Sequence, residues 1–79
     1  MLFLIEYDRT SGELISLRSF RNSDRNAAER ERLTLELDLN RRQVKREVVL
    51  LEARTEKALR LTHRRYFETL TELSKTKIA

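Results

Sequence analysis

One short segment limits the folds open to this chain more than any other. Residues 46–53 contain a short β-branched and apolar run with charged residues on either side of it. In the residues that follow, the apolar side chains recur at the spacing of a helix. The four consecutive apolar residues 48–51 are typical of a strand that is covered on both faces. Thr55 follows at a position where its hydroxyl can cap a helix. The sequence therefore predicts a strand over residues 45–53 and a helix over residues 55–75.

The pattern of residues 2–20 predicts a β-hairpin. Two strand-like runs flank a turn that contains Asp8 and the only glycine of the chain, Gly12. The carboxylate of Asp8 can accept backbone hydrogen bonds at the start of a turn, and Gly12 can adopt a left-handed conformation after it. We expect the register that places Ile5 opposite Ile15, because it gathers the most apolar side chains on one face.

A helix is predicted over residues 24–40, which are rich in alanine, leucine, glutamate and arginine. The leucines at positions 33, 35, 37 and 39 alternate strictly, however, as they would in a half-buried strand. Leucine, glutamate and aspartate are poor strand formers, so a helix is the favoured interpretation, with the four leucines on two separate stripes. Sequence alone leaves open whether residues 32–39 are helix or strand.

These elements follow the order ββαβα in a single domain that spans residues 1–79. A helical crossover between the second and third strands favours a parallel arrangement of the two, and the first strand then fits between them. The predicted fold is an α+β two-layer sandwich, a three-stranded sheet of split β-α-β, ferredoxin-like character with both helices on one face. The alternative is a β-hairpin followed by one long α-helix over residues 24–77.

The uncovered sheet face predicts a partner. In this arrangement Leu2, Leu4 and Leu14 remain on the face away from the helices. A bare apolar patch on a small domain indicates an interaction surface. We therefore expect a homo-oligomer that forms through the open sheet face.

Composition argues against several kinds of site. The chain has no cysteine and one histidine, so neither a disulfide bond nor a zinc site is expected. A single glycine is too few for a loop that cradles phosphate. We predict no metal site and no cofactor. No apolar run approaches the ~20 residues that span a membrane, and no targeting segment is recognisable, so we expect a cytoplasmic protein without membrane contact.

His63 and Tyr66 are weak candidates for catalysis. The sequence places both on the predicted second helix, with His63 in its apolar sector. A functional interpretation makes His63 a proton carrier and Tyr66 a second hydrogen-bonding group, with an arginine to hold an anion. A structural interpretation, in which both rings pack at the edge of the core, is favoured because no serine or acid is tied to His63 by its spacing. The role of His63 stays open.

The basic residues are weak candidates for nucleic-acid binding. The net charge is +4 at pH 7, which favours acidic partners. Those that would contact phosphates form a cluster before the third strand and a stripe on the second helix: Arg41, Arg42, Lys45, Arg46, Lys57, Arg60 and Arg64. Acidic residues are interspersed among them, so a mixed-charge surface is favoured over a nucleic-acid site.

The function favoured by the sequence is that of a non-enzymatic, self-associating interaction module or small accessory subunit. A basic regulator that binds nucleic acid is the first alternative. A small ligand-binding or catalytic dimer that uses His63 is the second. No motif identifies a substrate, a reaction or a pathway.

Overall fold

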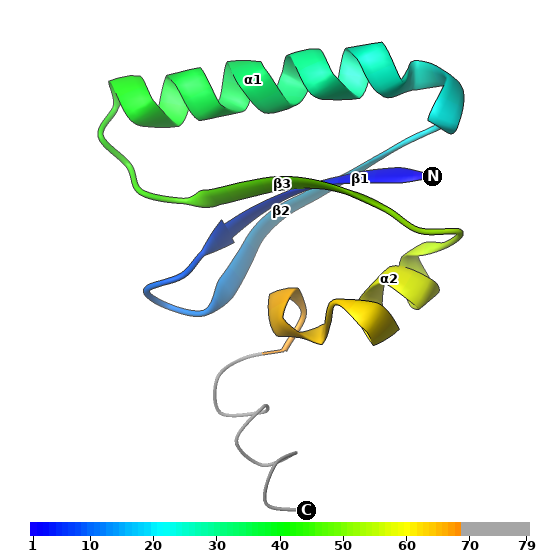
Figure 1. The fold of residues 1–79 in the computed structure, drawn as a ribbon. Helices are drawn as coiled ribbons and strands as arrows, with labels where there is room; N and C mark the ends of the chain where they lie inside the picture. The colour runs from blue at the N-terminus through cyan, green and yellow to red at the C-terminus, as the bar shows by residue number, and fades with distance from the viewer. Residues whose placement is uncertain (69–79) are drawn as a thin grey trace, which may run out of the picture.

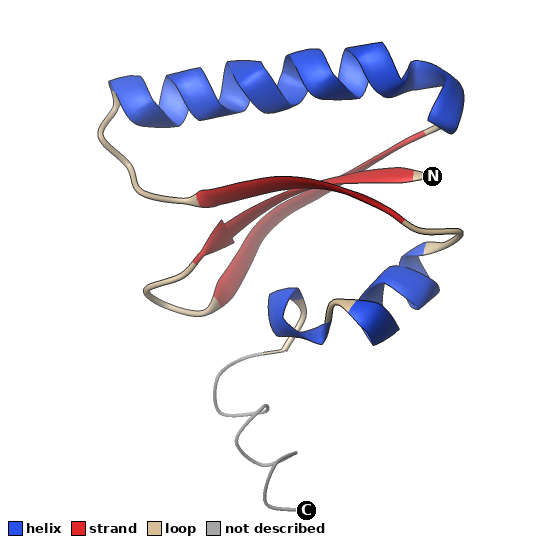
Figure 2. Cartoon of the chain, viewed as in Figure 1, coloured by secondary structure: helices blue, strands red, loops and turns tan. Residues whose placement is uncertain are grey.

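The fold is a three-stranded sheet with helical segments on both sides (Figure 1 and Figure 2). The computed structural model describes residues 1–68. In chain order its elements are β1 (Leu2–Asp8), β2 (Glu13–Phe20), the 3-10 turn η1 (Asn22–Asp24), α1 (Arg25–Arg41), β3 (Glu47–Glu52), α2 (Glu56–Thr62) and the 3-10 turn η2 (Arg64–Tyr66). The predicted α+β class and the element order ββαβα are confirmed.

β1 is the central strand, and the strand order is β2-β1-β3. Both neighbours run antiparallel to β1, so β2 and β3 are parallel to each other. The prediction that the first strand lies between the other two is therefore confirmed. Residues 32–39 are helical, and β3 follows α1 as a separate element. This excludes both the strand interpretation of that stretch and a single helix over residues 24–77.

The two helices cover opposite faces of the sheet, with α1 on one side and α2 on the other (Figure 1). The expectation that both helices cover one face is wrong, and the elements stack in three layers rather than two. The physical reason is that β1 is apolar on both sides. Leu2 and Leu4 belong to one face, Phe3 and Ile5 belong to the other, and none is more than 4% exposed. The face that was expected to be open is occupied by α1.

The main core lies between the sheet and α2. Phe3, Ile5 and Tyr7 of β1 pack with Leu59 of α2 and Tyr66 of η2. Half-buried side chains from the other strands and the α2 segment surround them: Leu14, Leu17, Val49, Leu51, Ala53 and Phe67. Leu59 is the one buried side chain of α2, so it provides most of the contact between this short helix and the sheet.

α1 packs over β1 and β3 through its two buried residues, Ala28 and Leu39. The alternating leucines of α1 therefore have different environments. Leu39 is buried, whereas Leu33 and Leu37 are 53% and 60% exposed. The predicted separation of these leucines into two helical stripes is confirmed, and only one stripe faces the sheet.

The turn of the hairpin has the predicted geometry. The side chain of Asp8 accepts hydrogen bonds from the backbone N–H groups of Thr10 at 2.9 Å and Ser11 at 3.3 Å. Gly12 has a φ of 71°, in the left-handed region that glycine adopts most readily. Its N–H donates to the carbonyl oxygen of Asp8 at 2.8 Å and closes the loop.

The register of the hairpin differs from the prediction. Ile5 lies opposite Leu17 rather than opposite Ile15. The register shifts beside Tyr7, which lies opposite Leu14, so Ile15 is an extra residue in β2 and is 42% exposed. The predicted register is wrong for two reasons: Asp8 rather than Tyr7 lies opposite Glu13, and the bulge adds one more residue, so Leu14 packs against the core in place of Ile15.

α2 begins as predicted but ends early. Thr55 is its N-cap, and the Thr55 hydroxyl accepts a hydrogen bond at 3.0 Å from the backbone N–H three residues later. The helix ends at Thr62, because His63 has a non-helical backbone with φ −125° and ψ 52°. The expected continuous helix over residues 55–75 is therefore wrong in its described part, and residues 69–75 lie outside that part.

Candidate functional site

Glu47, Arg65 and Tyr66 form a compact polar cluster at one end of the sheet. Glu47 is the first residue of β3 and lies opposite Tyr7 of β1, and η2 carries the other two. The hydroxyl of Tyr66 donates a hydrogen bond to Glu47 Oε2. Arg65 Nη2 donates to the same oxygen at 2.5 Å and to the Tyr66 hydroxyl at 2.7 Å. Arg9 of the hairpin loop reaches Glu47 Oε1 at 3.7 Å, so three parts of the chain converge on one carboxylate.

This environment shifts two pKa values in opposite directions. Burial alone would raise the pKa of Glu47, but the hydrogen bond from Tyr66 and the positive charges of Arg65 and Arg9 outweigh burial, so the pKa lies below its ordinary value. The pKa of Tyr66 is raised, first by burial and then by its hydrogen bond to the negative Glu47. At neutral pH the cluster therefore contains an ionised carboxylate and a protonated phenol.

Aromatic contacts hold the same cluster in place. The rings of Tyr7 and Tyr66 meet edge to face, with centroids 5.1 Å apart and planes at 87°. The guanidinium of Arg65 lies 4.3 Å from the centroid of Tyr66 and 5.6 Å from that of Tyr7, within the range of cation–π attraction. The arrangement fastens η2 to the sheet, and the catalytic role expected of Tyr66 stays a prediction.

His63 belongs to a different set of contacts, at the end of α2. Its backbone N–H donates to the carbonyl oxygen of Leu59 at 2.9 Å, and its Nδ1 lies 2.9 Å from Thr62 Oγ1. The side chain is half-buried. A backbone hydrogen bond of 3.2 Å links Tyr66 N–H to the carbonyl oxygen of His63, but the two side chains have different partners. The structure thus gives His63 a place in the helix end, and its role in chemistry stays a prediction.

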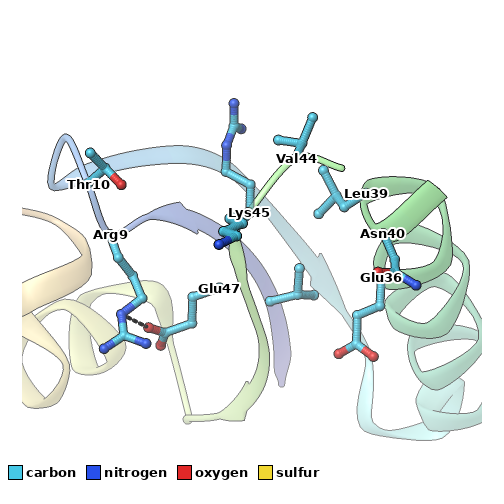
Figure 3. A pocket seen from close by; sticks show the side chains of 10 residues that line it. Arg9, Thr10, Glu36, Leu39, Asn40, Val44, Lys45 and Glu47 are labelled. Atoms are coloured by element: carbon cyan, nitrogen blue, oxygen red, sulfur yellow. Dashed lines mark ion pairs between the residues drawn. The ribbon is translucent and has the colours of Figure 1, made fainter. Parts of the chain in front are cut away.

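An open groove lies where α1 ends and β3 begins (Figure 3). It encloses about 690 Å³ and is lined by Arg9, Thr10, Glu36, Leu39, Asn40, Val44, Lys45, Arg46, Glu47 and Val48. Opposite charges meet on its walls, since Arg9 pairs with Glu47 (Figure 3) and Arg46 pairs with Glu6. Among the described residues, Lys45 makes no ion pair. One uncommitted positive charge is too little to define an anion site here.

A partly buried ion pair fixes the approach to β3. Glu6 is the buried charged residue of β1, and Arg46 Nη1 donates to Glu6 Oε2 at 2.6 Å. Arg46 Nε also lies 4.0 Å from Asp8 Oδ2. Breaking a fully buried ion pair costs about 3–5 kcal/mol, because the remaining charge is left without a partner. Arg46, a predicted phosphate contact, therefore already has a structural role.

The structure separates the seven basic residues predicted to contact nucleic acid. Arg41, Arg42, Lys45 and Arg46 lie at the end of α1 and in the loop after it, whereas Lys57, Arg60 and Arg64 lie in α2 and η2, on the other side of the sheet (Figure 1). Most of them are ion-paired: Arg41 and Arg42 with Asp38, Arg46 with Glu6, Arg60 with Glu56 and Arg64 with Glu68. They form no continuous basic face, and the nucleic-acid role stays a prediction.

Metal-binding clusters, membrane-spanning helices and unpaired buried polar side chains are all absent from residues 1–68. No three His, Cys, Asp or Glu side chains in this part are grouped so that they could hold a metal ion. None of its helices has the length and apolar character needed to cross a membrane. Each buried side-chain nitrogen or oxygen in it has a hydrogen-bond partner.

The outer edge of β3 presents backbone groups that pair with no other strand in the described part of the chain. Within residues 1–68, β3 pairs with β1 alone. Ala53 exchanges backbone hydrogen bonds with Met1: its N–H donates at 3.0 Å, and its carbonyl oxygen accepts from the Met1 amino group at 2.9 Å. Hydrogen-bonded residues alternate along an antiparallel strand. The N–H and C=O groups of Val48, Leu50 and Glu52 therefore point away from β1.

The two edges of the sheet differ in how they are protected. β2 contains the bulge at Ile15, and its Arg18 lies over Phe20 at 5.3 Å and pairs with Glu31 of α1. β3 reads Glu-Val-Val-Leu-Leu-Glu, with no proline, glycine or lysine, and it pairs with β1 without a bulge. Proteins blunt exposed edges with bulges, charges or prolines, because an unprotected edge recruits another strand. The β3 edge therefore has the chemistry of a strand-pairing surface.

Sequence reasoning predicted this strand but not the importance of its edge. The apolar residues 48–51 indicate coverage of both faces, and the crossover places the third strand at the side of the sheet. The four consecutive apolar residues, with charges only at the two ends of the strand, are the signal that, combined with that position, indicates an edge open to strand pairing.

Known proteins offer no guide to the function of this chain. No protein family model matches it, and neither does any curated protein or solved structure.

Proposed function

We propose that this chain is a non-enzymatic interaction module that associates with copies of itself. The observation that carries the proposal is the free edge of β3, an apolar strand whose outward backbone groups have no partner among the described residues. Such an edge binds another strand through main-chain hydrogen bonds, and its alternate side chains provide specificity. The polar clusters around Glu47 and Glu6 have their partners within the chain, which supports a role without catalysis.

The size of the chain supports the same proposal. A domain of 79 residues buries only about 60% of the surface that its unfolded chain exposes. A single core in a domain of this size rarely supplies more than about 3–5 kcal/mol of net stability, and the 79 residues include no cysteine for a disulfide bond. Binding of a second copy stabilises the folded state by mass action. The lack of cysteine also agrees with the cytoplasmic location that forms part of this proposal.

A second apolar surface competes with the β3 edge as the site of association. Leu33 and Leu37 lie one turn apart on the outer face of α1, 53% and 60% exposed. Isolated exposed leucines are common on monomeric proteins, and they supply no directional bonds. We therefore favour the β3 edge and use the leucines as a control.

Analytical ultracentrifugation over a dilution series tests the proposal. We expect a dimer that dissociates on dilution, with Leu37→Ser leaving the dissociation constant unchanged because this residue lies on the outer face of α1. A chain that sediments as a monomer at all micromolar concentrations would contradict self-association. A dimer that Leu37→Ser abolishes would move the association to α1.

A further inference from the structure

We propose that the β3 strands of two copies pair antiparallel about a two-fold axis at Val49, so that two three-stranded sheets join into one continuous sheet. This inference rests on the proposed self-association and adds the strand, its direction and its register. β3 is the edge strand that pairs with β1 without a bulge, whereas the other edge strand, β2, has one. Pairing through it requires no rearrangement of α1 or α2, which cover the faces of the sheet rather than its side (Figure 1).

Symmetry limits the pairing to a few registers. Dimers of identical chains most often form about a two-fold axis, which makes the contact self-complementary. An axis perpendicular to the sheet keeps both copies of α1 on the same side of the joined sheet. Residues that lie opposite each other in the two copies must then have side chains on the same face of the sheet. Because side chains alternate between the two faces along a strand, this is possible only if a residue lies opposite its own copy at the axis. The central candidates are Val48, Val49 and Leu50.

The charges at the two ends of β3 select Val49. With the axis there, Arg46 lies opposite Glu52 of the second copy, and the same pair recurs on the other side of the axis. With the axis at Leu50, Glu52 lies opposite Val48 of the second copy, and Arg46 lies beyond the end of the second copy's β3. With the axis at Val48, Arg46 faces a leucine instead. Only the Val49 register therefore matches opposite charges.

Both charged groups are accessible for this contact. Glu52 has a side chain that is 61% exposed and bonds to Arg25 of α1 at 2.9 Å. Arg46 is 24% exposed and uses Nη1 for Glu6, which leaves further N–H donors of its guanidinium free to meet a second carboxylate. Positions 46 and 52 differ by six, an even number, so both side chains lie on the side of the sheet that α1 covers.

The backbone groups fit the same register. Val48 and Leu50, whose N–H and C=O groups point outward, lie opposite each other across the axis and exchange both hydrogen bonds. Val49 then meets Val49 of the second copy as a non-hydrogen-bonded pair, with Cα atoms about 4.5 Å apart. This separation lies within the range of about 4.4–6.8 Å that a disulfide bond requires.

Single cysteine variants of the full chain test the register, because the chain has no cysteine of its own. Val49→Cys is expected to form a covalent dimer under mild oxidation, whereas the matched variant Leu50→Cys is not. Two copies of residue 50 would be diagonal neighbours about 7–8 Å apart, beyond the reach of a disulfide bond. A mixture of Val48→Cys and Leu50→Cys is expected to give the mixed disulfide, because these residues lie directly opposite.

The outcomes separate this inference from the proposed function. A covalent dimer from Leu50→Cys and none from Val49→Cys would overturn the register. A dimer in the ultracentrifuge with no cross-link from any of these variants would overturn pairing through β3 and leave self-association standing. A monomer in the ultracentrifuge would overturn both. Circular dichroism of each reduced variant shows whether it has folded.

Amide hydrogen exchange of the unaltered protein provides a test without substitutions. In a single copy the N–H groups of Val48 and Leu50 point away from β1 and have no partner among residues 1–68, whereas the N–H of Val49 faces β1 in either state. We expect exchange at Val48 and Leu50 to slow by about tenfold or more when concentration rises through the dimer transition, with Val49 protected throughout. Rapid exchange at Val48 and Leu50 under conditions where the protein is a dimer would overturn the inference.

Discussion

Replacing Leu59 by alanine should remove most of the attachment of α2 to the sheet. Leu59 is fully buried, and it packs in the core with Phe3, Ile5 and Tyr7. The substitution removes three carbon atoms, which costs about 2.4 kcal/mol at ~0.8 kcal/mol per buried methylene, before any cavity remains. The cavity adds to this, so we expect a total loss of about 3–4 kcal/mol in the free energy of unfolding.

Leu61 is the matched control for this substitution. It lies in the same seven-residue helix but is 68% exposed. Leu61→Ala makes the same chemical change with the same effect on helix propensity, and we expect it to alter stability by less than ~0.5 kcal/mol. Urea unfolding followed by circular dichroism, at one fixed protein concentration, measures both variants. Sodium sulfate in all samples keeps Leu59→Ala folded enough to give a baseline.

Double-mutant cycles extend this prediction to the placement of the two helices. Ile5 contacts the α2 side of the sheet and Leu4 the α1 side, although the two are adjacent in β1. The loss in free energy of unfolding from Leu59→Ala combined with Ile5→Val should therefore differ from the sum of the two single losses by about 0.5 kcal/mol or more. The losses from Leu59→Ala and Leu4→Val should instead add to within about 0.3–0.5 kcal/mol. Equal coupling to both positions, or equal losses from Leu59→Ala and Leu61→Ala, would refute the opposite-face arrangement.

Two further predictions concern the polar cluster and the turns. The lowered pKa of Glu47 means that its charged form stabilises the folded state above the ordinary value of 4.5, and that this stabilisation is lost as pH falls through the lower folded pKa. Glu47→Gln should therefore lower the free energy of unfolding in urea at pH 7, and lower it much less near pH 3. A loss of the same size at both pH values would contradict a stabilising role for the charge of Glu47. Gly12→Ala should cost about 1 kcal/mol, because Gly12 has a φ of 71°, and Gln43→Gly should stabilise by a similar amount, because Gln43 holds a φ of 60°. Thermal unfolding measures both, and two shifts of the same sign would refute the argument from backbone strain.

Apart from the central place of β1, which the crossover rule predicted, the features that sequence predicted correctly depend on neighbouring residues. Asp8 and Gly12 make the hairpin turn through contacts within a few residues, and Thr55 caps α2 through an N–H three residues away. Helix propensity, which is also a local property, favoured a helix over the alternating leucines of α1. Elements of this kind form wherever the tertiary structure permits them.

The features that sequence did not predict depend on distant residues. The helix capped by Thr55 ends early, at Thr62. Soon after that end, Tyr66 bonds to Glu47, which lies nineteen positions away in the sequence, and no local signal marks the end of the helix. The bulge at Ile15 adds one residue to β2, and alternation within a strand cannot reveal it. The placement of one helix on each face covers both sides of β1, whose residues 2–5 are all apolar, but sequence does not show which helix covers which face.

The difference between the two edges also determines how far association can proceed. Strand pairing with another copy can take place only at the two edge strands of the sheet, β2 and β3. If both sides were unprotected, strand pairing would continue from copy to copy and produce a fibre. Pairing of β3 with β3 about a two-fold axis consumes the unprotected edge of each copy and leaves β2 at both ends, with its bulge at Ile15 and its Arg18. The protection of β2 is therefore what would close the assembly at a dimer, and removal of that protection should convert a dimer into longer aggregates.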